Sequence, residues 1–210
     1  IIDFELTNKS NKEISLSVGG TMQNFIGEDG SMNKAGLNKN IYRREEGFSG
    51  IFLTSEEGDK TIDPWGEMAL VSTSKGELSY RTSWLPMHWG SSILDFWDDL
   101  SEDGKLENRT DTLTTKPMAS LAVSEVLPPN GTKTIRFLIT WYFPNRTAWS
   151  TKPLKNYYST KYAGAWDVAS KTVPKLPYLE NKTIEFVDAF CSSEIPTEAK
   201  EAALFNVSTL

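Results

Sequence analysis

The densest group of side chains able to do acid–base chemistry is a run of five carboxylates: Asp95, Asp98, Asp99, Glu102 and Asp103. Two such groups on opposite sides of a substrate could serve as general acid and general base. No pair among the five is singled out by its neighbours. The run therefore favours a solvated helix face with an acidic loop at its end over a catalytic pair.

Metal and nucleophile chemistry have little support. Residues 99–104 resemble the first half of a calcium loop, but Thr110 stands where the bidentate Glu is expected, so calcium is not favoured. His88 and Cys191 are the only residues of their types and cannot supply the ligands of a structural zinc site. His88 has aromatic and apolar neighbours that favour a packed histidine over a general base. No phosphate-cradling motif is present, and no cofactor is expected.

Four aromatic residues gather around the same stretch: Trp84, Trp89, Phe96 and Trp97. The face of an exposed Trp can stack on the apolar CH surface of a sugar ring, so exposed Trp on a β domain would indicate carbohydrate binding. Phe96 and Trp97 are expected in the buried stripe of a helix. For Trp84 and Trp89 an exposed and a buried position are equally compatible with the pattern.

The composition describes an ordinary folded chain. Of its 210 residues, 39% are hydrophobic and 24% are charged, and the net charge of −6 with scattered Lys and Arg excludes a nucleic-acid footprint. No apolar run approaches the roughly 18 residues that a membrane span needs. The chain opens on an apolar strand without a signal peptide, and its last helical pattern ends without a stop signal. We therefore expect a piece of a larger protein.

The first two thirds of the chain alternate in β fashion. Residues 1–19 and 67–84 are expected to form hairpins, and residues 118–127 and 135–143 to form two strands joined by the turn Pro128–Gly131. Residues 27–50 are expected to be a long loop. Many short strands with Gly and Pro turns favour an antiparallel β-sandwich. Six Asn-x-Ser/Thr matches are interpreted as turn chemistry rather than glycosylation sites: Asn8, Asn108, Asn130, Asn145, Asn181 and Asn206.

Helical periods appear in two places. The spacing of Ile93, Phe96, Trp97 and Leu100 predicts one helix that interrupts the strands. Later, residues 176–190 carry an apolar stripe, and Pro196 suits the first turn of a helix over residues 197–210.

Several segments together are similar to a known family. Their order and spacing resemble the bile-acid β-glucosidase or non-lysosomal glucosylceramidase family, glycoside hydrolase family 116, over nearly the whole chain. The segments that carry this resemblance are Thr21–Gly27, Phe96–Gly104, Trp141–Arg146 with Tyr157-Tyr158 and Ala165-Trp166-Asp167, and Ile195–Asn206.

The resemblance implies a partial N-terminal β-sandwich over residues 1–148, a helical linker over 149–195 and the first helix of an (α/α)6 catalytic barrel over 196–210. The parent enzyme would be a retaining β-glucosidase whose two carboxylates lie in that barrel, so no catalytic residue is assigned to this chain. Its partners would be a β-glucoside and the helical catalytic domain, with a leaning towards a secreted or periplasmic location.

The same resemblance places Trp84, Trp89 and Arg146 near the substrate cleft or the interdomain boundary. Arg146 is equally compatible with an ordinary exposed arginine. Two other functions stay open on the residues alone. One is a free-standing carbohydrate-binding β-sandwich, which needs Trp84 and Trp89 exposed on one platform. The other is a structural or interaction domain with buried Trp and no sugar affinity.

Overall fold

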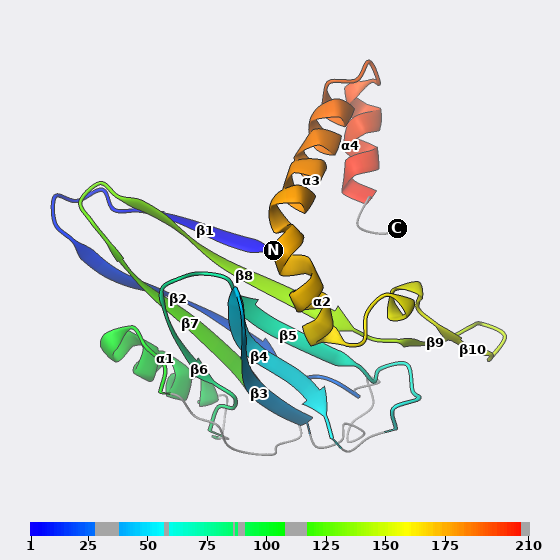
Figure 1. The fold of residues 1–210 in the computed structure, drawn as a ribbon, viewed down its shortest axis with the longest axis horizontal. Coiled ribbons are helices and arrows are strands. Elements are labelled where there is room, and N and C mark those ends of the chain that lie inside the picture. The colour runs from blue at the N-terminus through cyan, green and yellow to red at the C-terminus, as the bar shows by residue number, and fades with distance from the viewer. Residues whose placement is uncertain (28–37, 57–58, 86, 88–90, 108–116, 207–210) are drawn as a thin grey trace. The chain divides into compact units, whose positions relative to one another are not determined.

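The computed structural model describes residues 1–27, 38–56, 59–85, 87, 91–107 and 117–206. The chain divides into two compact units, Ile1–Val173 and Pro174–Leu210. Among the described residues, the strands all belong to the first unit, and the second unit is helical (Figure 1).

Two antiparallel sheets build the sandwich of the first unit. The five-stranded sheet has the order β1 (Ile2–Thr7), β8 (Thr132–Tyr142), β5 (Glu67–Ser72), β4 (Phe48–Ser55) and β3 (Asn38–Glu45). The three-stranded sheet has the order β2 (Ile14–Gln23), β7 (Met118–Leu127) and β6 (Glu77–Arg81). The predicted antiparallel β-sandwich is confirmed.

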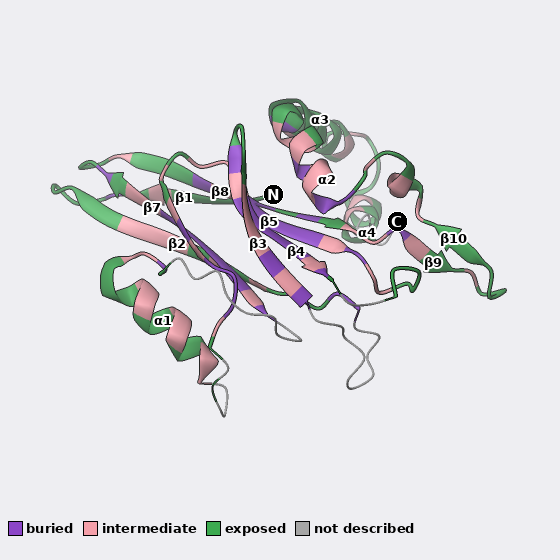
Figure 2. Cartoon of the chain, turned by 60° about the horizontal axis from the view of Figure 1, so that its bottom comes forward, coloured by how far each residue is buried: buried purple, intermediate pink, exposed green. Residues whose placement is uncertain are grey.

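The core lies between the two sheets because alternate residues of each strand point inward. On β7, Ala119, Leu121 and Val123 are fully buried, and on β8 Ile135 and Phe137 meet them from the other sheet. Figure 2 shows the buried residues running along β7, β5 and β4.

The predicted hairpins at residues 1–19 and 67–84 are wrong, although their strands exist. β1 pairs with β8 and β2 with β7, and likewise β5 and β6 lie in different sheets. The strands β7 and β8, joined by the Pro128–Gly131 turn, are also in different sheets. All three short connections therefore cross the core from one sheet to the other. The apolar–polar alternation along a strand does not distinguish a hairpin within one sheet from two strands in opposite sheets, because the apolar face of each strand points into the same core in both cases.

The loop expected over residues 27–50 is wrong from residue 38 onward, and residues 28–37 lie outside the described part. β3 and β4 pair in register from Asn38↔Ser55 to Glu45↔Phe48 around a two-residue turn, Glu46-Gly47. Gly47 has a φ of +86°, which glycine adopts without strain. Glu-Gly is not among the preferred two-residue hairpin turns such as Asn-Gly and Asp-Gly, so the signal for this hairpin in the sequence is weak.

Helices cover the outer faces of the sandwich. Helix α1 (Ser92–Asp103) packs on the three-stranded sheet, where its side chains meet Gly19 of β2. Helix α2 (Ala165–Thr172) packs on β5 and β8 of the other sheet. Between β8 and α2 the chain forms a small ribbon of β9 (Asn145–Thr147) and β10 (Pro153–Lys155), followed by the 3-10 turn η2 (Tyr157–Thr160).

The second unit contains α3 (Leu176–Cys191) and α4 (Thr197–Asn206), preceded by the short 3-10 turn η3 (Val173–Lys175). These helices confirm the helical periods read from the sequence, up to residue 206. Whether α4 begins a barrel stays a prediction. None of the helices in the described part is long and apolar enough to cross a membrane.

Candidate functional site

Trp84 is half-buried and holds helix α1 on the sheet. Its indole Nε1 donates a hydrogen bond of 2.7 Å to Ser120 Oγ on β7. Its ring stacks on Phe96 of α1 with the ring centroids 5.4 Å apart and the planes 21° from parallel. The polar and the apolar parts of the indole are thus both engaged within the unit. Trp89, the other candidate of this group, lies outside the described residues.

Trp97 is not in the buried stripe of α1, and that prediction is wrong. Its side chain is 58% exposed, whereas Phe96 and Leu100 face the sheet. The reason is that Gly19 on β2 leaves only a narrow depression for the helix. A Cβ at Gly19 would lie 3.1 Å from Leu100 and 3.3 Å from Phe96, so two side chains fill it and the third is left outside.

Arg81, at the end of β6, forms buried ion pairs with two residues of the acidic run. Its guanidinium pairs with Asp95 and Asp99, each at 2.9 Å, and also donates a short hydrogen bond to the backbone oxygen of Asp95. The Arg81 side chain is 3% exposed, and Asp95 is 8% exposed. The expectation of a wholly solvated acidic face is therefore wrong for Asp95 and Asp99, which are one helical turn apart and face the sheet.

No metal centre emerges from the acidic run. Residues 99–103, which resemble part of a calcium loop, form the last turn of α1, and Asp99 is engaged by Arg81. Across the described part of the chain, no group of three or more His, Cys, Asp or Glu side chains is arranged to hold a metal ion.

Arg146 is exposed and lies on β9, opposite Leu154 of β10. The ribbon that carries it and helix α1 beside Trp84 are at opposite ends of the first unit (Figure 1). The structure therefore does not bring Trp84 and Arg146 into one site.

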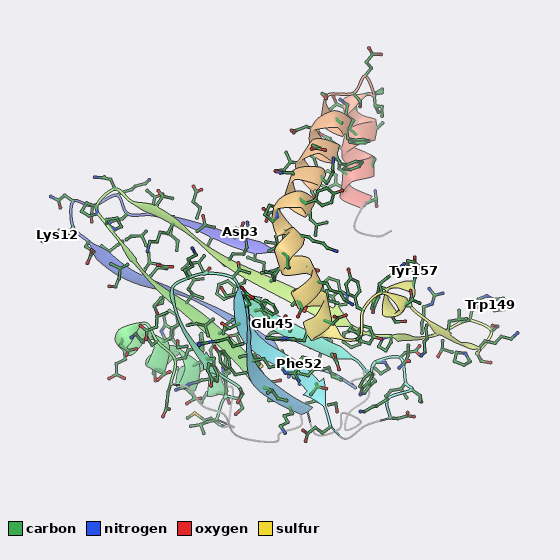
Figure 3. The ribbon with its side chains drawn as sticks, in the orientation of Figure 1. Asp3, Lys12, Glu45, Phe52, Trp149 and Tyr157 are labelled. Atoms are coloured by element: carbon green, nitrogen blue, oxygen red, sulfur yellow. The ribbon has the colours of Figure 1, made fainter. Side chains whose placement is uncertain are left out.

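The ribbon is basic and aromatic. Trp149 at its tip is 99% exposed, and Tyr157 just after it is 74% exposed; Figure 3 shows both side chains on the projecting part of the chain. Residues 128–166 contain no Asp or Glu, in a chain whose net charge is −6. The cations of the ribbon and the turn after it are Arg146, Lys152, Lys155 and Lys161.

The chain after the ribbon folds back onto the end of β8. The hydroxyl of Tyr158 donates to the backbone oxygen of Phe143 at 2.5 Å and accepts from its backbone N–H at 2.9 Å. Asn156 adds hydrogen bonds to the same oxygen and to that of Pro144. These bonds explain why the Trp141–Arg146 and Tyr157-Tyr158 motifs occur together.

Helix α2, which contains the Ala165-Trp166-Asp167 motif, is anchored to three strands. Thr140 on β8 donates to the backbone oxygen of Ala165, and the backbone N–H of Ala165 donates to Glu67 on β5. Trp166 donates its Nε1–H to Glu45 at the end of β3. A carboxylate at the first turn of a helix also suits the positive end of the helix dipole.

The charges beneath α2 are partly desolvated. Burial raises the pKa of Glu67, and the hydrogen bond from Ala165 and the nearby Arg43 only partly oppose this. Burial lowers the pKa of Arg43, whose guanidinium lies 3.7 Å above the ring of Phe52. Sequence reasoning missed both residues because helix α2, which covers them, lies about a hundred positions further along the chain.

These motifs lie in a stretch of the chain that matches a known protein family. Residues 1–178 match the family described as beta-glucosidase 2, glycosyl-hydrolase family 116 N-term. The match covers most of the chain and confirms the resemblance read from the sequence motifs. A search of curated proteins finds no match.

Proposed function

Because the chain belongs to the N-terminal family of glycosyl-hydrolase family 116, we propose that it is the non-catalytic β-domain portion of a retaining β-glucosidase or glucosylceramidase-like enzyme. In this proposal its role is to brace a helical catalytic domain and to wall one side of that domain's substrate cleft. The family match over residues 1–178 is the observation that carries the proposal.

The arrangement of carboxylates supports a non-catalytic role. A retaining glycosidase needs two carboxyl groups about 5–5.5 Å apart, one free to attack the sugar and one free to protonate the leaving oxygen. Asp95 and Asp99, one helical turn apart on α1, are both paired with Arg81. Their charges maintain the position of α1 and are not available to a substrate.

The ribbon supports the bracing role. An indole that is 99% exposed at the tip of a short ribbon gains nothing within this unit, but it would be stabilised by burial against another surface. The surrounding cations would complement an acidic surface on that partner. Arg146 lies at the base of the ribbon, where a planar guanidinium could bind carboxylates or backbone carbonyls of the helical domain.

The enzyme assignment is tested by assay of a longer protein that includes this chain and the region after Leu210. We expect hydrolysis of an aryl β-glucoside with retention of anomeric configuration, and we expect none from residues 1–210 alone. A well-folded longer protein with no glycosidase activity would reject the assignment.

The bracing role is tested by Arg146→Ala and Trp149→Ala. We expect each to lower the unfolding midpoint of the longer protein and to leave that of residues 1–210 unchanged, because the contacts they lose are with the other domain. Arg44→Ala, an exposed arginine on β3, is the matched control and should change neither midpoint. Equal losses in both proteins would show that Arg146 stabilises the β domain itself.

A further inference from the structure

We propose that the groove between α1 and the three-stranded sheet is a carbohydrate-binding site in which Trp97 is the stacking platform. This α1 groove is lined by Trp97 and Glu102 of α1, Ser15 and Ser17 of β2, and Lys105 and Lys133, among others. The proposal does not depend on the bracing role, because the groove and the ribbon are at opposite ends of the unit.

The exposed indole is held in place by the rest of the helix. Phe96 and Leu100 fill the depression over Gly19, and Arg81 binds two carboxylates on the same side of α1. Rotation of the helix that would bury Trp97 would pull Asp95 and Asp99 away from Arg81. The orientation of α1 thus keeps the indole of Trp97 exposed in the lining of the groove, where its large apolar face is open to a ligand.

The groove has the dimensions of a ligand site. Its volume is about 890 Å³, within the range of about 300–1,000 Å³ common for small-molecule sites. Its floor is ordered by hydrogen bonds between strands and helix end. Ser17 and Ser124 are 2.9 Å apart through their hydroxyl oxygens, and Ser124 donates to the backbone oxygen of Gly104 at 2.9 Å.

The charges in the groove favour a neutral ligand rich in hydroxyl groups. Lys105 pairs with Glu77 at 2.8 Å and Lys133 pairs with Glu125 at 2.6 Å, so donors and acceptors of both signs alternate along the walls. Glu102 and Asp103 add two further carboxylates to the lining, so an anionic ligand would meet repulsion there. A sugar hydroxyl both donates and accepts, and it can bind beside either member of each pair.

An aromatic face and a polar wall together are the chemistry that recognises a pyranose ring. The apolar CH face of the sugar packs on the indole, and the hydroxyls at its edge face Glu102 and Ser15. The side chain of Glu102 is exposed at the end of α1. We infer that the ligand is a neutral glucan oligosaccharide rather than a phosphorylated or acidic sugar.

Calorimetric titration of residues 1–210 with cellotetraose tests the proposal directly. We expect binding with a dissociation constant of about 1 mM or tighter, and at least a tenfold loss in Trp97→Ala. Trp149→Ala is the matched control, since it removes an equally exposed indole that no groove surrounds, and it should bind like the wild type. Ser15→Ala should weaken binding more mildly, through one lost hydroxyl.

Two results would overturn the proposal. One is the absence of binding to cellotetraose, maltotetraose and xylotetraose at about tenfold the expected dissociation constant. The other is equal binding by Trp97→Ala and the wild type. Because Trp97 is largely exposed, its replacement should leave the unfolding midpoint unchanged, and this measurement separates a lost ligand contact from a lost fold. Failure of the bracing test on Arg146 would leave these outcomes unaffected.

Discussion

Arg81 shows how a single buried charge can decide the position of a helix. Its side chain is 3% exposed and is neutralised by two carboxylates that belong to α1 rather than to its own sheet. A buried ion pair is costly to desolvate, so its value lies in geometry: α1 can satisfy Arg81 in one orientation only. These ion pairs, together with the packing of Phe96 and Leu100 over Gly19, fix the orientation of α1 that leaves Trp97 exposed.

Arg81→Met should therefore strongly destabilise the β domain. The substitution leaves Asp95 buried without its cation, and breaking such a pair costs about 3–5 kcal/mol in the free energy of unfolding. Lys105→Met, which breaks an exposed pair with Glu77, is the control and should change the free energy of unfolding little. Urea unfolding measures both. Similar small losses in the two variants would mean that water reaches Asp95.

Glu67 predicts a particular dependence of stability on pH. Burial raises its folded-state pKa above the ordinary value of 4.5. Between the unfolded and the folded pKa, the folded state keeps a proton that the unfolded state has released, so this residue lowers stability as pH rises. Hydrogen bonds from Arg136 and Lys171 lower the folded-state pKa of Asp3 and Asp167, respectively. These two residues therefore have the opposite effect: the stability that they contribute is lost as pH falls.

Glu67→Gln isolates the first effect, because Asp3 and Asp167 are the same in both proteins. We expect the stability of the variant relative to the wild type to increase as pH rises through 4.5 and the range just above it. Urea unfolding at a series of pH values measures this difference. Glu46→Gln, in the exposed β3–β4 turn, is the control and should follow the wild type. A constant difference between Glu67→Gln and the wild type would contradict the assigned direction.

At the scale of elements, the strands were predictable and their partners were not. The alternation of Ile135 and Phe137 with polar residues identifies β8 from local sequence alone. Whether two consecutive strands pair in one sheet or lie in opposite sheets depends on contacts between residues far apart in the chain, such as Ile2 and Phe137, which are more than a hundred positions apart. A turn-rich connection is compatible with both outcomes, and no local pattern distinguishes them.

The candidate site was predictable only in part for a related reason. The helical spacing predicted that Phe96 and Trp97 both lie in the buried stripe of the helix. In the structure, Phe96 and Leu100 pack over Gly19, which belongs to a distant strand, and Trp97 does not. Arg146 is exposed, which is compatible with both of its interpretations, so its interdomain role stays a prediction. The anchoring of α2 by Glu67 could not be read from the sequence, since 98 positions separate it from Ala165.

Asn8 stabilises the two stacked connections at one end of the sandwich. Its side chain is 1% exposed and its amide donates to the backbone oxygens of Lys12, Leu127 and Pro128. The interpretation of the Asn8 sequon as turn chemistry fits this burial, which leaves no room for a glycan.

Asn8→Ala should cost about 1–3 kcal/mol in unfolding free energy, because it leaves buried carbonyl groups without a donor. Asn130→Gly in the adjacent connection is the control. Asn130 has a φ of +55°, which glycine adopts freely, so we expect no loss. Equal stability of Asn8→Ala and the wild type by urea unfolding would show that water replaces the amide.

At the scale of the whole molecule, the β domain has two surfaces of different chemistry. Helix α1 ends in an acidic turn beside a groove with paired charges, whereas the β9–β10 ribbon is basic and ends in a bare indole. The first surface suits a neutral, hydroxyl-rich ligand and the second an acidic protein surface. Under the two proposals, one sandwich would contact a sugar and a neighbouring domain at the same time.

The extent of the folded unit gives the last prediction. Residues 1–173 form one compact unit, whereas the sequence predicted a β-sandwich portion ending at residue 148. Residues 149–173 include α2, and Trp166 of that helix packs on Phe48 with the ring centroids 5.0 Å apart. Loss of α2 would expose Phe48 and Leu138, which are 6% and 3% exposed in the intact unit.

Exposing two large apolar side chains costs about 3–6 kcal/mol, a large share of the 5–15 kcal/mol typical of a domain. We therefore expect residues 1–173 to unfold in urea at the same midpoint as residues 1–210. Residues 1–148 should unfold at a much lower midpoint or without cooperativity. Extending them to residue 173 should restore the midpoint, because Thr140 regains its hydrogen bond to Ala165 and Phe48 regains its cover. Equal midpoints for 1–148 and 1–173 would instead place the boundary of the β domain within the ribbon, after β9, and make α2 part of the linker.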